Sequence, residues 1–176
     1  MIITGGKYNG RHIIAPAESI TRPTLSKVRM GVFNTLYSMI GEFENKSFLD
    51  VFGGSGIMGL EALSRGFSNV LVFEKNPKAA QIIKKNYTSL KLTPNIGVGD
   101  SLRLIDKLDM VYDVAYIDPP YSSVIYEEAF NVLKNKARLV VAEHYEDIYT
   151  NDFSLIKFKN YGGKKVSFYI YKSFVI

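Results

Sequence analysis

The sequence predicts an α/β fold with a mostly parallel β-sheet, and two observations carry this prediction. Between residues 48 and 142, short apolar runs of strand length alternate with helical patterns, which is typical of βαβ units and a parallel sheet. After residue 150, two β-rich segments at 154–159 and 164–171 flank Asn160-Tyr161-Gly162-Gly163, which predicts an antiparallel pair. The chain has 176 residues, so we expect a single domain over residues 1–176.

The individual elements follow in chain order. Residues 2–4 and 12–14 predict a small β-hairpin, and a loop leads from it to Thr24, so that residues 1–24 precede the core. Thr24 is a suitable cap for a first helix over 25–39, whose apolar residues recur at helical spacing. Within residues 25–176 we expect strands at 48–52, 69–74, 96–98, 112–117 and 138–142, and helices ending near 65, at 77–90, after 100 and at 124–133.

Composition excludes several kinds of protein and of site. The chain has no cysteine, which rules out disulfides and thiolate metal sites, and its two isolated histidines form no metal site. No apolar stretch reaches the roughly 18 residues of a membrane helix, and Met1 to Arg11 lacks the apolar region of a signal peptide. We therefore expect a soluble cytoplasmic protein that needs no metal.

The net charge of +5 is concentrated at the two ends of the chain. Residues 150–176 carry five Lys/Arg against one acid and residues 1–45 carry five against three, whereas residues 46–149 are nearly balanced. A basic surface attracts polyanions such as nucleic acid. Charge alone leaves open the other explanation, a solvated surface that aids solubility.

A glycine-rich turn follows the first predicted strand. Gly54-Ser55-Gly56-Ile57-Met58-Gly59 matches G-x-G-x-x-G between a strand and a helix, and such glycines let a ligand approach the backbone closely. Glu74 ends the second strand, where an acid accepts hydrogen bonds from the ribose hydroxyls of an adenosine cofactor. A turn that serves packing and a solvated carboxylate before a helix are the alternatives. Together the two features predict a nucleotide-like cofactor and leave NAD and S-adenosylmethionine open.

Two further acids favour S-adenosylmethionine over NAD. Asp50 lies in the first strand, four residues before the glycine motif, where a carboxylate suits the water or amino group around a methionine moiety and repels a pyrophosphate. Asp100-Ser101 follows the third strand, where the carboxylate is placed to accept from an adenine amino group, with a helix cap as its alternative role. Ligands bind at the carboxyl ends of such strands. The predicted cofactor contacts are Asp50, Gly54, Ser55, Gly56, Glu74, Asp100 and Ser101.

The tetrapeptide Asp118-Pro119-Pro120-Tyr121 follows the fourth predicted strand and is the predicted reaction site. An exocyclic amine on a base is a poor nucleophile because its lone pair is delocalised into the ring. The Asp118 carboxylate and the Pro119 carbonyl can each accept one N–H bond and so free that lone pair for attack on a sulfonium methyl. Tyr121 offers a ring for stacking on the base. An ordinary Pro-Pro turn after a strand is the alternative.

With these motifs the chain resembles the RsmD-type 16S ribosomal RNA guanine-N2 methyltransferases, a family of class I methyltransferases. The resemblance covers nearly the whole chain. Its marks are Gly5-Gly6-Lys7-Tyr8, Gly10-Arg11, Thr21-Arg22-Pro23-Thr24, Val28-Arg29, Phe33-Asn34, the run Leu49 to Gly56, the run Gly59 to Gly66, and Asp118 to Tyr121. One departure is Gly53, where the family usually has alanine.

The resemblance implies a Rossmann-like class I methyltransferase fold, with a seven-stranded sheet whose last strand is antiparallel and which helices flank. It implies S-adenosylmethionine as the methyl donor, with Thr24 closing over it, and Asp118 to Tyr121 as the catalytic loop. It also implies a guanine of 16S rRNA as the acceptor, within an assembled or assembling small ribosomal subunit. Candidates for RNA phosphate contacts are Lys7, Arg11, Arg22 and Arg29. Arg22 and Arg29 have a structural alternative, bracing the first helix.

Three other functions compete with this one. An N6-adenine or N4-cytosine nucleic-acid methyltransferase uses the same tetrapeptide, although such enzymes usually carry an added recognition region that this sequence lacks. A dinucleotide-dependent oxidoreductase needs a second domain for its substrate, and Asp50 argues against it. A non-catalytic RNA-binding module is opposed by the intact Asp118 and glycine loop. We expect a monomer.

Overall fold

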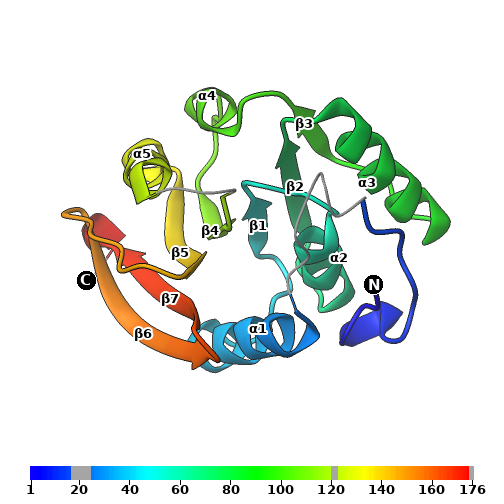
Figure 1. Ribbon diagram of the computed structural model, residues 1–176, viewed down its shortest axis with the longest axis horizontal. Helices are drawn as coiled ribbons and strands as arrows, with labels where there is room; N and C mark the ends of the chain where they lie inside the picture. Colours follow the sequence, from blue (N-terminus) through cyan, green and yellow to red (C-terminus); the bar gives the residue numbers. More distant parts are fainter. Residues whose placement is uncertain (17–24, 120–122, 175–176) are drawn as a thin grey trace.

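A computed structural model of the chain describes residues 1–16, 25–119 and 123–174, and its centre is a seven-stranded sheet (Figure 1). The strand order is β3-β2-β1-β4-β5-β7-β6. Strands β1 to β5 run parallel, and β7 is antiparallel to both of its neighbours, β5 and β6. The strands are β1 (Ser47–Asp50), β2 (Asn69–Glu74), β3 (Ile96–Val98), β4 (Tyr112–Ile117), β5 (Ala137–His144), β6 (Phe153–Tyr161) and β7 (Lys164–Tyr171). The predicted mixed sheet with its antiparallel last strand is confirmed.

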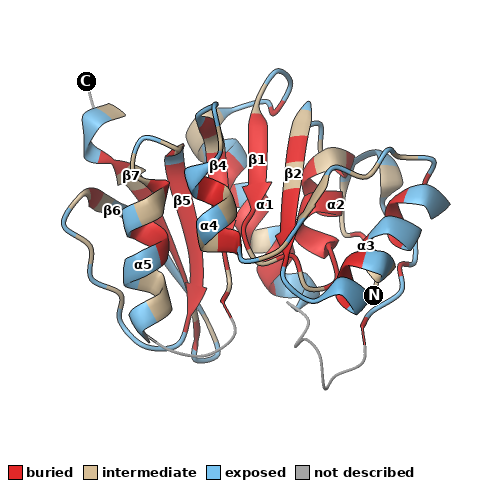
Figure 2. Ribbon diagram, turned by 90° about the horizontal axis from the view of Figure 1, so that it is seen from above, coloured by how far each residue is buried: buried red, intermediate tan, exposed pale blue. Residues whose placement is uncertain are grey.

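Helices cover both faces of this sheet. Side chains of successive strand residues point to opposite faces, so Phe48 packs with α1 to α3 and Leu49 packs with α4 and α5. Both faces of the central strands are therefore buried, and the outward sides of the helices are exposed (Figure 2). The helices are α1 (Ser26–Ile40), α2 (Ile57–Ser64), α3 (Pro77–Ser89), α4 (Ser101–Asp106) and α5 (Ser123–Leu133). Within the described residues, no helix is both long and apolar enough to cross a membrane.

The N-terminal segment forms the predicted hairpin only over a short stretch, in which the N–H groups of Ile3 and Ile13 donate to the carbonyls of Arg11 and Met1 at 3.0 and 2.9 Å. A single antiparallel bridge joins Ile2 to His12, and the 3-10 helix η1 (Gly6–Tyr8) fills the space between them. The reason lies at Gly6, which has a φ of +74° and sits against the end of α2, where an added Cβ would come within 1.8 Å of the Ser64 carbonyl oxygen. The segment is shaped to fit that helix end, which leaves it too few residues for a longer ladder.

The C-terminal hairpin is tighter than predicted. Its turn consists of Gly162 and Gly163 alone, both with positive φ, which is the conformation that two-residue hairpin turns favour. Tyr161 and Lys164 therefore still pair across the hairpin. Strand β5 also runs past the predicted end at residue 142 to His144, because β7 continues to pair with it.

The first helix begins one residue later than expected. Leu25 occupies the N-cap position and makes no side-chain cap hydrogen bond. The predicted cap, Thr24, lies outside the described residues.

A buried carboxylate, Glu61 of α2, joins the N-terminal segment to the first two helices. Its Oε1 accepts from the Thr4 N–H at 2.8 Å, from the Thr4 hydroxyl at 2.7 Å and from Arg29 Nε at 3.1 Å, and its Oε2 accepts from Arg65 Nε at 3.3 Å. Glu61 is 0% exposed and Arg29 2% exposed. Arg29 also donates to the Ile2 carbonyl at 2.6 Å. Its assignment to RNA phosphates is therefore corrected, because the guanidinium is buried, and the structural alternative describes it.

We expect Glu61→Gln to destabilise the protein strongly, because it leaves the buried Arg29 guanidinium without its counter-charge. Breaking a buried ion pair by removing one partner costs about 3–5 kcal/mol. Urea unfolding followed by circular dichroism measures the loss, with Glu128→Gln on the exposed side of α5 as the matched control. A Glu61→Gln protein as stable as that control would contradict a structural role for this pair.

Candidate functional site

Three carboxylates meet at the carboxyl edge of the parallel strands. Asp50 is the last residue of β1, Glu74 is the last residue of β2, and Asp118 directly follows β4. Strand β1 lies between β2 and β4 in the sheet, so Asp50 is central. The other two carboxylates both act on its ionisation. This carboxylate cluster, Asp50, Glu74 and Asp118, is the candidate site.

Asp50 is a buried acid whose carboxylate receives no hydrogen bond from the described residues. It is 1% exposed, and neither of its carboxylate oxygens has a hydrogen-bond partner among the described residues. Burial raises the pKa of Asp50 to about 7, and the carboxylates of Glu74 and Asp118 add to the shift. The backbone N–H groups of Gly59 and Phe52 partly oppose it without reaching hydrogen-bond geometry. A buried carboxylate of this kind favours a cationic or hydrogen-donating ligand.

The glycine loop closes tightly over the end of β1. Gly54 and Gly56 have φ values of +55° and +76°, which side chains rarely allow, and the Gly56 N–H donates to the Gly53 carbonyl at 2.7 Å. A Cβ at Gly56 would lie 2.7 Å from Ile83 Cγ2 on α3. Ser55 is buried, and its hydroxyl accepts from the Ile57 N–H at 3.3 Å. The loop therefore serves packing, the alternative considered above, as well as offering a narrow approach to its backbone.

Glu74 ties this loop to the end of β2. Its Oε2 accepts from the Gly54 N–H and its Oε1 from the Asn76 N–H, both at 2.7 Å. At 9% exposure it is not the solvated carboxylate of the alternative explanation. A carboxylate has about four acceptor positions, so these two bonds leave capacity for hydroxyl groups of a ligand.

Asp100 serves as the N-cap of α4. One carboxylate oxygen accepts from the Leu102 N–H at 3.1 Å and the Arg103 N–H at 3.3 Å. The cap, which was the alternative role, is thus the role that the structure shows. The side chain is exposed, whereas Ser101 beside it is buried.

The predicted reaction site is described only in its first half. Asp118 has a side chain that is 26% exposed, and Pro119 is buried. Pro120 and Tyr121 lie outside the described residues, as do Thr24 and Arg22.

The remaining candidates for RNA contacts, Lys7 and Arg11, are both exposed on the N-terminal segment. This segment rests on the end of α2 that is opposite to the glycine loop, since Ser64 Oγ donates to the Gly5 carbonyl at 2.5 Å. An eight-residue helix is about 12 Å long, so the two ends of α2, one at the glycine loop and one at the N-terminal segment, lie about that far apart.

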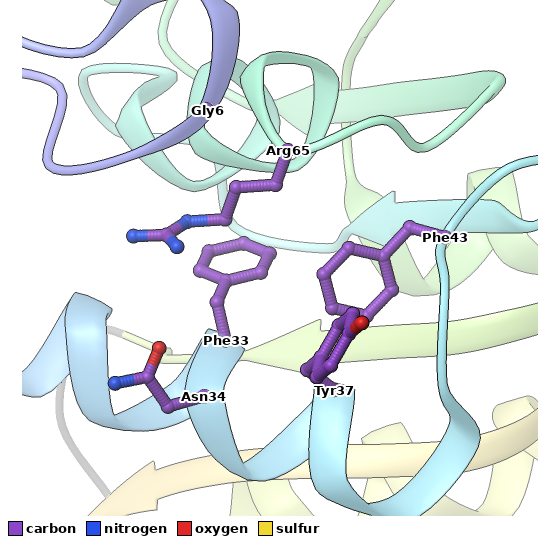
Figure 3. A pocket seen from close by; sticks show the side chains of 6 residues that line it. All are labelled: Gly6, Phe33, Asn34, Tyr37, Phe43 and Arg65. Carbon is purple, nitrogen blue, oxygen red and sulfur yellow. The ribbon is translucent and has the colours of Figure 1, made fainter.

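A cavity of about 390 Å³ lies at that same end of α2 (Figure 3). The Arg65 guanidinium sits above the Phe33 ring, with 5.1 Å between its central carbon and the ring centroid. A second cavity of about 340 Å³ lies between the end of α1 and the β6–β7 side of the sheet. Neither cavity is lined by a residue of the carboxylate cluster, so cavity size does not locate this site.

Three residues beside Asp118 were not predicted from the sequence. Lys164 Nζ lies 3.9 Å from Asp118 Oδ2 and contacts a carboxylate oxygen of Glu143. The Tyr126 hydroxyl donates to the Glu143 carbonyl at 2.6 Å, and burial, followed by the charge of Asp118, raises the pKa of Tyr126. The sequence did contain one indication of Glu143, because this acid directly follows the apolar run 139–142. Among the residues that the structure describes, no three His, Cys, Asp or Glu side chains are grouped to hold a metal ion.

Comparison with known proteins agrees with this architecture. Residues 1–170 match the family described as "Conserved hypothetical protein 95". YlbH of Bacillus subtilis (strain 168) is 32% identical over 184 residues, covering 96% of this chain and 98% of the relative. Ribosomal RNA small subunit methyltransferase D of Escherichia coli (strain K12) is 30% identical, covering 78% and 68%. Among solved structures, yhhF from Escherichia coli superposes with a TM-score of 0.83 at 25% identity, covering 98% of each chain.

We expect Asp50→Asn to stabilise the ligand-free protein increasingly as pH rises. Folding raises the pKa of Asp50 above its ordinary value of 3.8, so the contribution of this group to stability is complete below about pH 4 and is lost as pH rises through 7. An asparagine does not titrate, so its advantage grows by on the order of 3 kcal/mol between pH 5 and pH 8.

Urea unfolding at pH 5, 6, 7 and 8 measures this difference. The exposed Asp109, changed to Asn, is the matched control. An Asp50→Asn difference that stays flat over this pH range would contradict the buried, proton-binding state of Asp50.

Proposed function

This chain belongs to the family described as Conserved hypothetical protein 95, and from that premise we propose that it is an S-adenosylmethionine-dependent methyltransferase. The finer proposal is that it methylates the exocyclic N2 amine of a guanine in small-subunit ribosomal RNA. The observation that carries the proposal is the carboxylate cluster, in which the buried Asp50 lacks a hydrogen-bond donor.

The charge of the site supports this choice of cofactor. S-adenosylmethionine has a sulfonium and an ammonium group, whereas a dinucleotide has an anionic pyrophosphate. Asp50, Glu74 and Asp118 together present negative charge, which attracts the first and repels the second. The oxidoreductase alternative therefore fits the site poorly.

Each residue of the proposed cofactor site has its own task. Asp50 would hold the ammonium of the methionine moiety, Glu74 the ribose hydroxyls, and Asp100 the adenine amino group. Gly54 and Gly56 leave the backbone open to close approach. When bound, the cofactor supplies an electrophilic methyl group.

On the acceptor side, Asp118 and Pro119 prepare the amine. The carboxylate and the carbonyl each accept an N–H bond, which turns the nitrogen towards tetrahedral geometry and releases its lone pair from the ring. Methyl transfer itself depends mainly on alignment of the reacting atoms. Tyr121, by its place in the motif, is proposed to stack on the base.

The relatives support ribosomal RNA as the acceptor. The Escherichia coli relative is named a ribosomal RNA small subunit methyltransferase, and a Buchnera aphidicola relative of the same name is 34% identical, covering 76% of this chain and 70% of its own length. Exposed Lys7 and Arg11 are proposed to contact phosphates of that RNA. We propose that the protein acts as a monomer on an assembled or assembling small subunit.

Transfer of labelled methyl groups tests the acceptor. Purified protein, labelled S-adenosylmethionine and either small subunits or naked 16S rRNA are incubated, and the RNA is digested to nucleosides. We expect N2-methylguanosine, with more label on the particle than on naked RNA. N6-methyladenosine or N4-methylcytidine would replace the guanine assignment with the alternative amino-methyltransferase activity.

We expect Asp118→Ala to lower kcat by at least about 100-fold, because the acceptor amine loses the carboxylate that positions it. Cofactor affinity, measured by calorimetry, should change little, since Asp118 is proposed to meet the acceptor. Asp109→Ala, an exposed acid of the loop before β4, is the control. A variant Asp118→Ala with near-normal turnover would refute this role.

A further inference from the structure

Lys164 is a cation held beside the proposed reaction site by a part of the chain remote in sequence. It is the first residue of β7, directly after the Gly162-Gly163 turn. Its ammonium contacts the Glu143 carboxylate and lies 3.9 Å from Asp118 Oδ2. Its side chain is only 11% exposed. It therefore differs from the other lysines of the basic C-terminal hairpin, which are at the surface.

Glu143 fixes the position of this ammonium. It is 0% exposed, one carboxylate oxygen accepts from the Tyr116 hydroxyl on β4, and its backbone carbonyl accepts from the Tyr126 hydroxyl on α5. The Tyr145 ring, with its centroid 5.7 Å from Lys164 Nζ, covers the ammonium from the side. Because β4 and α5 hold Glu143, and Glu143 pairs with Lys164, the position of the ammonium beside Asp118 is well defined.

Asp118 lies close to charged groups of both signs. They include the carboxylate of Asp50 from β1 and the ammonium of Lys164 from β7, and the hydroxyl of Tyr126 from α5 is also near. Two further carboxylates add negative charge nearby. Glu143 of β5 contacts Lys164, and Glu74 of β2 acts on Asp50. Carboxylates that share a site drive one another towards the protonated form, and an opposite charge within about 4–6 Å reverses that tendency.

We propose that Lys164 is a positioning residue for methyl transfer, whose ammonium, anchored by Glu143, keeps the Asp118 carboxylate ionised and turned towards the acceptor amine. The inference rests on the proposed function. A protonated Asp118 would offer the amine a donor where it needs an acceptor.

The transfer step balances with these groups. The amine nitrogen forms the new N–C bond, the C–S bond breaks, and its electron pair stays on sulfur, which becomes a neutral thioether. The proton that the nitrogen releases passes to the Asp118 carboxylate and then to water. Lys164 exchanges no proton or bond in this step, so it acts only through Asp118.

The test uses four variants of the full-length protein. Lys164→Met removes the cation, and Lys164→Arg restores it. The double variant Glu143→Gln/Lys164→Met removes both charges, so that it avoids the penalty of leaving Glu143 buried and unpaired. Lys165→Met is the matched control, because Lys165 pairs instead with Asp147, at 2.6 Å.

The first readout needs no turnover. Carbon-13 NMR of protein labelled at aspartate carboxyl carbons follows the ionisation of Asp118, whose signal is assigned by its loss in Asp118→Ala. We expect Asp118 to titrate about one pH unit higher, or more, in Lys164→Met than in the wild type. In the double variant the rise should be smaller, because the negative charge of Glu143 is removed together with the cation. Lys164→Arg and Lys165→Met should match the wild type.

The second readout is the pH profile of kcat with small subunits as substrate. In each Lys164→Met protein the acidic limb of this profile should move to higher pH by as much as the Asp118 titration does, with KM for S-adenosylmethionine within about twofold of the wild type. Lys164→Arg should return the acidic limb of the kcat profile to its wild-type pH. If Lys164 had only a structural role, its replacement would change the stability of the protein and would not shift the acidic limb of the kcat profile.

The outcomes separate the inference from the function. An Asp118 titration that rises in neither Lys164→Met protein overturns the inference, even if Asp118→Ala shows that the methyl-transfer proposal holds. A wild type that transfers no methyl group overturns the proposed function and, with it, the role of Lys164 in catalysis. Shifts of the titration and of the kcat limb together, rescued by arginine, support the inference.

Discussion

Parallel strands that end at one edge of a sheet force their terminal side chains together, and in this protein those side chains are acids. Asp50, Glu74 and Asp118 lie there together although Asp118 follows Asp50 by 68 positions in the sequence. The groups that offset the repulsion between these carboxylates differ from one position to the next. Two backbone N–H groups bind Glu74, the Lys164 ammonium lies beside Asp118, and Asp50 has neither. The least compensated charge is therefore the most buried one, which is the arrangement expected of a site that awaits a cation.

Helix α2 connects this edge to the opposite side of the molecule. It begins at the glycine loop and carries Glu61, which the N-terminal segment and α1 enclose through Thr4 and Arg29. The same helix thus bears the loop over the proposed cofactor site and the buried ion pair that holds the first helix. A displacement of Glu61 would move the start of α2, and with it the backbone that faces a ligand.

The sequence was a good guide wherever a pattern was local. Alternating strands and helices predicted the sheet, and the glycines at 162 and 163 predicted the hairpin. It left the role of Arg29 undecided, because nothing near Arg29 in sequence shows that Glu61 will bury it. It missed Lys164 for a related reason. Only the antiparallel pairing of β7 with β5 brings residue 164 beside residues 143 and 118, and such pairing leaves no local signature.

The two edge strands of the sheet determine whether sheets of different copies of this chain can pair edge to edge. One edge is β3, which has only three residues. The other is β6, whose exposed Leu155, Ile156 and Phe158 form a ready template for aggregation. Lys157 and Lys159 interrupt that apolar surface, and the strand shifts register between residues 155 and 157. Charge, irregular pairing and a short strand are devices by which natural sheets keep edges from joining, and all three occur at the edges of this sheet.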